Sequence, residues 1–357
     1  MERLLEKLDK LEQEHRLSKE EWITLIEGRT DAFAEKVFER ARKQRHIYYG
    51  NKVYIRGLIE FTNYCKNDCY YCGIRKSNCN AERYRLTEEE ILSCCENGYA
   101  SGFRTFVLQG GEDPYFDTER MTALIRRIRT AFPDCAITLS IGEKTKETYQ
   151  AFRQAGADRY LLRHETYNTD HYRKLHPEPL SAEERQGCLY ALKEAGYQVG
   201  SGIMVGSPYQ TAEHIAEDLL FLQELQPEMA GIGPFIPHKD TKFANEAAGT
   251  LELTLYLLGL LRIMLPKVLL PATTAVSTIH PDGRKLGILA GANVVMPNLS
   301  PKERRKHYSL YDNKRCMGDE AAEGLALLKA EMQEIGYEVV TDRGDFPQNF
   351  TKEDDYV

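Results

Sequence analysis

The chain has 357 residues, of which 42% are hydrophobic and 28% are charged, and its formal net charge is −7. This composition supplies a full globular core for one large domain or two, and the acidic balance disfavours nucleic acid as a partner, because phosphate contacts need clustered lysine and arginine. The sequence has no apolar run long enough to span a membrane, and nine cysteines in a chain whose N-terminus lacks an export signal predict a reducing, cytoplasmic location and no membrane partner.

The N-terminal residues are predicted to be helical. Leu4, Leu5, Leu8 and Leu11 recur at helical spacing, and residues 18–21 form a capping-box pattern that opens a second helix. After these helices, apolar runs that are typical of strands alternate with helical patterns. The strands are expected at 54–61, 105–108, 136–141, 159–162, 198–205, 229–236, 269–276 and 293–296, and the helices between and after them at 87–97, 118–131, 145–155, 181–195, 211–225, 251–265, 281–290 and about 319–335.

This alternation predicts an α/β protein made of parallel βαβ units. Eight units fit a (β/α)8 TIM-type barrel, whose usual size is about 250 residues. A doubly wound open sheet is the alternative, and the absence of a glycine fingerprint after the first strand disfavours it. We therefore expect an N-terminal helical cap over residues 1–50, a barrel over 51–340 and a polar C-terminal tail over 341–357. Three glycines are expected to end helices in the left-handed conformation, namely Gly98, Gly156 and Gly196.

Three closely spaced cysteines follow the first predicted strand. Cys65, Cys69 and Cys72 have the spacing C-x3-C-x2-C, and three thiolates can hold three irons of a [4Fe–4S] cluster while the fourth iron stays open to a ligand. A structural zinc site would need a fourth ligand and usually a second C-x2-C pair, which the sequence lacks. Chance clustering of buried cysteines is the other alternative, and the loop-forming residues around the motif disfavour it. The motif therefore predicts both the metal ligands and the catalytic centre.

Polar residues occur where other predicted strands end. In a (β/α)8 barrel these ends form the active site. Gln109, Gly110, Gly111 and Glu112 follow the second strand, and paired glycines let the backbone approach a ligand. A plain turn is the alternative for this segment.

Two charged residues elsewhere at the predicted mouth are candidate ligands of a small molecule. Glu165 follows the fourth strand and could accept from hydroxyl groups. Arg185 opens the next helix and could bind a carboxylate with both arms of its guanidinium. The alternative for each is a salt bridge on the barrel rim.

Three further residues are candidates for the barrel interior. Arg56 lies inside the first strand, where a lone cation is costly unless it is paired. It is either an anion anchor in a cavity or one half of an outward-facing ion pair. Thr273 and Thr274 either reflect simple strand propensity or point two hydroxyl groups into the mouth.

The cysteine motif resembles the signature of the radical S-adenosylmethionine (radical SAM) enzymes, and six segments together resemble the HydE family, the radical SAM maturases of [FeFe]-hydrogenase. The similarity covers about residues 50–345, and biotin synthase and methylornithine synthase share the first motif. The segments are 61–75, 108–115, 162–166, 231–238, 271–274 and 293–298.

The resemblance implies a [4Fe–4S] cluster whose open iron binds S-adenosylmethionine, followed by one-electron cleavage to methionine and a 5′-deoxyadenosyl radical. It implies a small organometallic iron substrate bearing carbon monoxide, cyanide and cysteine, transient contact with other hydrogenase maturases, and an electron donor. The implied cofactor-binding residues are Tyr71, Gln109, Gly110, Gly111, Glu112, Glu165, Arg185 and Met296. The implied substrate-binding residues are Arg56, Thr138, Arg163, Thr273, Thr274 and Tyr308.

The chain departs from this pattern near its C-terminus. Some family members bind a second cluster there through three cysteines, whereas this chain has only Cys316, so no second cluster of that kind is expected. Two functional alternatives remain open, a radical SAM mutase such as methylornithine synthase and a non-enzymatic cluster carrier. Cys79, Cys94 and Cys95 have no predicted role.

Overall fold

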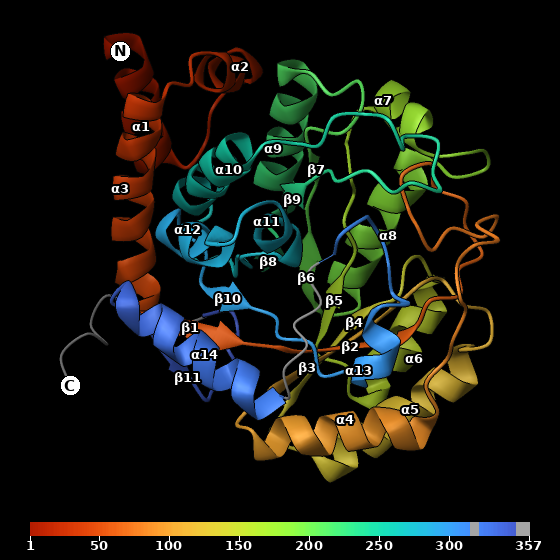
Figure 1. The fold of residues 1–357 in the computed structure, drawn as a ribbon. Helices are drawn as coiled ribbons and strands as arrows, with labels where there is room; N and C mark the ends of the chain where they lie inside the picture. The colour runs from red at the N-terminus through yellow and green to blue at the C-terminus, as the bar shows by residue number, and fades with distance from the viewer. Residues whose placement is uncertain (315–320, 348–357) are drawn as a thin grey trace.

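The structure is a computed structural model that describes residues 1–314 and 321–347. Its centre is a parallel sheet of six strands, whose spatial order follows their order along the chain (Figure 1). The strands, in spatial order, are β2 (Gly57–Thr62), β3 (Thr105–Gly110), β4 (Ala136–Ser140), β5 (Arg159–Leu161), β6 (Gln198–Ser201) and β8 (Met229–Ala230).

Further parallel pairings close this sheet into a barrel. Met229 bridges to Leu269, and Pro271 bridges to Val294, which begins β10 (Val294–Val295). In turn, β10 pairs with β1 (Lys52–Ile55), which leads directly into β2. The ring therefore has eight strand positions, and the predicted (β/α)8 barrel is confirmed. A short pair, β7 (Met204–Val205) with β9 (Gly233–Pro234), extends the wall beyond β6 and β8.

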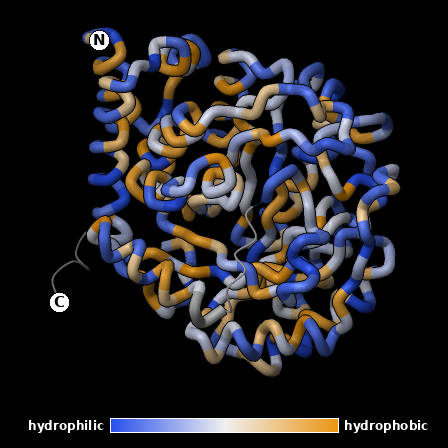
Figure 2. Tube along the Cα trace, in the orientation of Figure 1, coloured by the Kyte–Doolittle hydropathy of each residue, from blue (hydrophilic) through white to orange (hydrophobic). Residues whose placement is uncertain are grey.

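Helices surround the barrel (Figure 1). In Figure 2 several of them alternate between hydrophobic and hydrophilic residues along their length, as helices with one buried face do. They are α4 (Glu88–Ala100), α5 (Thr118–Ala131), α6 (Lys146–Ala155), α7 (Thr169–Leu175), α8 (Ala182–Glu194), α9 (Ala212–Leu225), α10 (Leu251–Met264), α11 (Thr274–Ile279), α12 (Gly283–Leu289), α13 (Lys302–Arg305) and α14 (Ala321–Glu334).

Two local predictions were wrong. Gly98 does not end a helix but lies inside α4, where a Cβ would come within 2.5 Å of Leu299 Cδ1, and Gly102 supplies the positive φ of 94° instead. The seventh strand ends before residue 276, because Thr273 is the N-cap of α11. The other two predicted caps, Gly156 and Gly196, have positive φ as expected.

Three helices precede the barrel, namely α1 (Glu2–Glu14), α2 (Lys19–Glu27) and α3 (Asp31–Tyr49). They pack beside the barrel, α2 against α9 and α3 against α10, and bury Trp22 and Phe33 completely. Among the described residues, no helix combines the length and the apolar character needed to cross a membrane.

The C-terminal part returns to the barrel. Strand β11 (Glu338–Val340) pairs in parallel with β1, and residues 341–347, which the sequence assigns to a polar tail, contact the first residues of several barrel strands. The remaining tail residues, 348–357, and Cys316 lie outside the described residues.

Candidate active site

The three cysteines lie in the loop after β2, and this loop is bonded to other loops at the mouth of the barrel. The amide of Lys66 donates to Glu112 O at 2.9 Å, that of Tyr70 to Leu175 O at 3.0 Å, and that of Gly73 to Leu310 O at 2.8 Å. A turn bond from Cys72 N to Cys69 O, 3.2 Å long, holds two of the thiols near each other. The loop is thus fixed from three sides before any metal is bound.

The chemistry of the three thiols fits iron–sulfur ligation. None of them forms a disulfide, and each is partly buried. Burial, followed by the nearby Cys65, raises the pKa of Cys72 to about 12, and burial, Cys72 and Cys65 raise the pKa of Cys69. Ligation to iron would offset the cost of forming three neighbouring thiolates. No group of three His, Cys, Asp or Glu side chains in residues 1–314 and 321–347 is arranged to hold a single ion, and in a cubane each thiolate binds a different iron.

The segment after β3 packs directly on the cysteine loop. A Cβ on Gly111 would lie 2.2 Å from Tyr64 O and 2.8 Å from Cys65 Cβ, so only glycine allows this approach. Glu112 is 7% exposed. Its Oε1 accepts from the amide of Glu143 at 3.1 Å, and Lys66 Nζ lies 3.3 Å from its Oε2. The carboxylate is therefore held beside the cysteine loop, where a cofactor-binding residue is expected.

Arg185 and Glu165 lie on the same side of the mouth. Arg185 Nη1 is 3.0 Å from Glu143 Oε1, and its Nε donates to Arg163 O at 3.0 Å. Burial lowers the pKa of Arg185, but Glu143 and other neighbours more than compensate and raise it, so this guanidinium stays charged. Arg163 Nη2 donates to Glu165 Oε2 at 2.8 Å. Glu165 has a left-handed φ of 65°, unusual for a non-glycine residue.

Tyr71, which precedes the third cysteine, is held by a histidine that the sequence did not indicate. Tyr71 Oη and His176 Nε2 are 3.1 Å apart, and His176 Nδ1 lies 3.1 Å from Tyr172 O. Burial lowers the pKa of His176 to about 3, so the ring is neutral. Its Nδ1–H then donates to the carbonyl, and Nε2 accepts from the phenol. No local motif marks His176, which comes from the end of α7.

Several of the predicted substrate residues carry buried polar atoms that have no hydrogen-bond partner among the residues that the structure describes. Buried atoms without a hydrogen-bond partner in the described part of the chain include Arg56 Nε and Nη2, Thr138 Oγ1, Arg163 Nε and Thr273 Oγ1. Arg56 is 5% exposed, and its Nη1 donates to Met229 Sδ at 2.9 Å. An unsatisfied buried polar group costs about 1–3 kcal/mol, so these atoms mark a place for a polar ligand.

The other predicted residues, Tyr308, Thr274 and Met296, have different surroundings. Tyr308 is 1% exposed, and Lys314 Nζ lies 4.7 Å from the centre of its ring. Thr274 is the first residue of α11. Met296 packs against the cluster of Tyr49, Met229, Leu269 and Val294, which contains the methionine that accepts from Arg56.

A buried ion pair near Tyr308 was missed at the sequence level. Lys314 pairs with Glu60, and Asn298 Nδ2 donates to Glu60 Oε2 at 2.8 Å. Glu60 lies in β2, in register with Gln109 of β3. Like Arg56, Glu60 is a charged residue inside an apolar strand, and this feature of the sequence could have indicated it.

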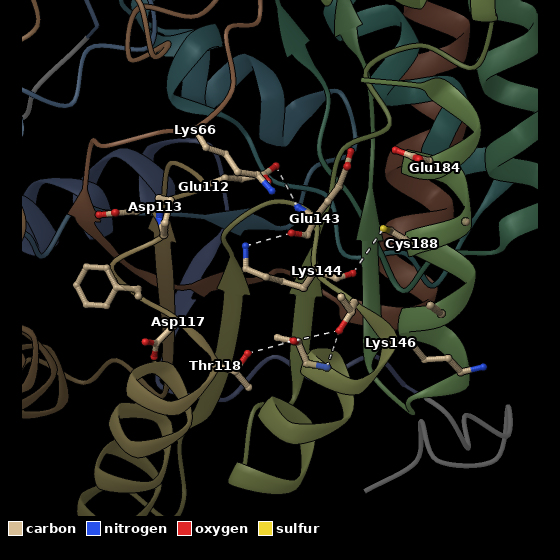
Figure 3. A pocket seen from close by; sticks show the side chains of 16 residues that line it. Lys66, Glu112, Asp113, Asp117, Thr118, Glu143, Lys144, Lys146, Glu184 and Cys188 are labelled. Atoms are coloured by element: carbon tan, nitrogen blue, oxygen red, sulfur yellow. Dashed lines mark hydrogen bonds and ion pairs between the residues drawn. The ribbon is translucent and has the colours of Figure 1, made fainter. Parts of the chain in front are cut away.

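A pocket of about 630 Å³ opens on the rim beside the cysteine loop (Figure 3). Its lining includes Lys66, Glu112, Glu143, Lys144 and Cys188. The pocket shares Glu112 and Glu143 with the site above but includes neither the three cysteines nor Arg56. It therefore borders a residue that the sequence predicts to bind the cofactor, without reaching the cysteines.

Residues 59–222 of the chain match the family model of the radical SAM superfamily. With the barrel and its three-cysteine loop, this match defines a radical SAM enzyme, a class that uses a [4Fe–4S] cluster and S-adenosylmethionine. The [FeFe] hydrogenase maturase subunit HydE of Thermotoga maritima is 46% identical to the chain over 314 residues, 88% of each protein. The chain belongs to the HydE family.

More distant relatives agree with the fold. The 3-methylornithine synthase of Methanosarcina barkeri is 32% identical over 311 residues, which cover 85% of this chain and 86% of that one. The crystal structure of methylornithine synthase (PylB) matches with a TM-score of 0.82 at 29% identity and covers 94% of this chain and 97% of that chain.

Proposed function

We propose that the chain binds a [4Fe–4S] cluster through Cys65, Cys69 and Cys72, cleaves S-adenosylmethionine at it, and acts in [FeFe]-hydrogenase assembly. Its substrate would be a small iron precursor that carries carbon monoxide, cyanide and cysteine. The 46% identity to HydE supports the pathway. The observation that carries the substrate class is Arg56, a buried guanidinium whose Nε and Nη2 have no partner in the described part of the chain.

The roles of the residues follow from their contacts. When bound, the cluster and S-adenosylmethionine supply an electron and an organic radical. Glu112 offers the carboxylate that would accept from the cofactor's ammonium group, and Arg185 offers a guanidinium for its carboxylate. Arg56, with Thr138 and Thr273, would bind an anionic group of the substrate, since cyanide and carboxylate groups are acceptors. The surrounding wall excludes water from a reactive radical.

A mutase reaction on an amino acid is the second candidate, because the methylornithine synthase of M. barkeri is 32% identical to the chain. An α-amino acid needs an acceptor for its ammonium group as well as a cation for its carboxylate. The carboxylates of Glu60 and Glu165 are already paired, with Lys314 and Arg163 respectively. The arrangement of charge therefore favours an anionic substrate over a zwitterion.

The substrate must come from another protein, because a carbon monoxide complex of iron is not freely available. We propose transient contact with other hydrogenase maturases, one of which supplies the precursor, and with a protein that donates the electron.

The test begins with anaerobic reconstitution and electron paramagnetic resonance of the reduced protein. A [4Fe–4S]⁺ signal that changes when S-adenosylmethionine is added is expected, and an indifferent signal would support a cluster carrier instead. The protein is then added to a hydrogenase maturation mixture that lacks HydE. Arg56→Gln should still cleave S-adenosylmethionine but fail to support maturation. Full maturation by Arg56→Gln, or methylornithine formed from lysine by the parent protein, would contradict the substrate assignment.

A further inference from the structure

The segment 341–347 crosses the end of the barrel opposite to the cysteines. The carbonyl of Arg343 accepts from Thr105 Oγ1 and from Arg159 Nη2, both at 2.8 Å. The amide of Phe346 donates to Gln198 Oε1 at 3.3 Å. Thr105, Arg159 and Gln198 are the first residues of β3, β5 and β6, so the segment is bonded to the start of three barrel strands.

The same segment also contacts the other side of the ring. Gly344 has a φ of 56°, and a Cβ there would lie 2.8 Å from Tyr54 Cγ, so its backbone rests on β1. Phe346 packs against the cluster that contains Met229, Leu269 and Val294. These contacts run around the ring, and the segment therefore forms the floor of the barrel.

Arg159 connects this floor to the predicted substrate site. It is fully buried, and its Nη1 donates to Thr105 Oγ1 at 3.1 Å. The two residues come from strands separated by β4, so they meet on the concave face, inside the barrel. In the β4–β5 pairing, Arg159 is in register with Thr138, one of the predicted substrate residues. Side chains of paired residues point to the same face of a sheet, so Arg159 neighbours the substrate site.

The two inner arginines differ in their partners. Arg159 Nη2 is 2.6 Å from Asp345 Oδ1, and its Nε donates to Gln198 Oε1 at 3.1 Å. Every nitrogen of its guanidinium thus has an acceptor, whereas within residues 1–314 and 321–347 Arg56 has only the sulfur of Met229. Although burial alone would raise it, the pKa of Asp345 is lowered to about 2, chiefly by Arg159 and Arg343. Besides burial, Arg159 lowers the pKa of Arg56, and Tyr49 and Asp345 raise it.

We propose that Asp345 is the fixed counter-ion of Arg159 and that segment 341–347 is the floor of the substrate cavity, so that, of the inner residues the structure describes, Arg56 alone presents uncompensated charge to the substrate. The proposal rests on the anion site of the proposed function and adds a specificity rule to it. Arg163 is paired to Glu165 and Lys314 to Glu60, and Arg343, which shares Asp345 with Arg159, is also paired to Asp158. Among the described inner residues, one excess positive charge, that of Arg56, therefore faces the ligand. The site should therefore select a group with a single negative charge over a doubly charged one.

Iodide and sulfate are suitable probes, titrated into the reconstituted full-length protein at constant ionic strength with thermal stabilisation as the readout. Asp345→Asn leaves Arg159 uncompensated and should tighten iodide binding about threefold to tenfold, as expected for one partly screened charge near the site, and sulfate binding by more. Asp342→Asn is the matched control. It removes the same charge from the same segment, but Asp342 is exposed, so little change is expected.

A second variant protects the test against misfolding. Arg159→Gln with Asp345→Asn removes both charges and should bind iodide with the affinity of the parent protein. Unchanged iodide and sulfate affinities in Asp345→Asn would overturn the counter-ion role, as would a change of tenfold or more in the double variant. Arg56→Gln separates this inference from the function beneath it. Unchanged iodide affinity in that variant would refute the anion site itself.

Discussion

Replacing Gly142 by alanine is expected to weaken cofactor binding as well as the fold. Gly142 follows β4 with a φ of 74°, and an added Cβ would lie 2.1 Å from both Cγ and Oε1 of Glu112. No real contact is that short, so the Glu112 side chain has to turn away. It would then lose the hydrogen bond from Glu143 N, now 3.1 Å long, and its 3.3 Å approach to Lys66.

Two energies decide the size of the effect. The left-handed conformation costs alanine about 1–2 kcal/mol of folding free energy. The proposed hydrogen bond from the ammonium group of S-adenosylmethionine to Glu112 joins two charged groups, and its loss costs about 1.5–3 kcal/mol of binding free energy. This corresponds to a dissociation constant for S-adenosylmethionine raised about 10- to 150-fold. The constant is measured from the change in the paramagnetic resonance signal of the reduced cluster as S-adenosylmethionine is added, and the stability is measured by thermal unfolding.

Gly336→Ala is the matched control. Gly336 also has a positive φ, 80°, but a Cβ there would meet nothing within 4 Å. It carries the backbone cost without touching Glu112, so its melting temperature should fall and its cofactor affinity should stay. If Gly142→Ala lost no more cofactor affinity than Gly336→Ala, the role of Glu112 in binding the cofactor would be wrong.

Three further predictions concern the cluster, the cofactor and the fold. Cys69→Ala should lose its iron and sulfide content and its cofactor cleavage, whereas Cys79→Ala, at an exposed cysteine, should keep both. Arg185→Lys should raise the S-adenosylmethionine concentration needed for half-maximal cleavage about tenfold, because lysine cannot bind a carboxylate with two arms, and an unchanged value would argue against this contact. Burial lowers the pKa of His171 from 6.5 to about 4 and that of His176 to about 3. Below pH 6.5 the unfolded chain therefore binds protons on these two histidines that the folded chain does not bind. The free energy of unfolding should fall as the pH drops from 6.5 towards 4, by up to about 1.4 kcal/mol per pH unit for each histidine. His176→Gln should make the dependence of the unfolding free energy on pH shallower in denaturant titrations. An unchanged dependence would refute the conclusion that His176 is neutral in the folded protein.

Local patterns were sufficient to predict most of the barrel. The capping box at Thr87 begins α4 where the sequence placed a helix, and Gly156 ends α6 with a φ of 117°. These signals depend on a few neighbouring residues, so a single sequence displays them. The seventh strand was predicted too long because Thr273 and Thr274 favour strands and helix starts alike, and the tertiary structure decides between the two.

Some parts of the candidate site can likewise be predicted from local sequence, and others cannot. The three cysteines lie within eight residues of the sequence, so their spacing can be recognised there. The pairs Glu60–Lys314 and Arg159–Asp345 join residues that are 254 and 186 positions apart. No spacing rule connects such residues. They meet only because closing the barrel brings the C-terminal part of the chain back to β1.

These long-range pairs explain why the unpaired arginine is informative. A buried charge without a partner costs several kcal/mol, and the barrel shows how such a cost is avoided, because Arg159, Arg163 and Lys314 each have a carboxylate partner. Arg56 has none among the described residues, and two of its nitrogens are unsatisfied. A fold that neutralises three inner cations but leaves the fourth unpaired holds that charge at a cost in stability. A negatively charged ligand would remove that cost, so the buried charge of Arg56 by itself favours an anionic substrate.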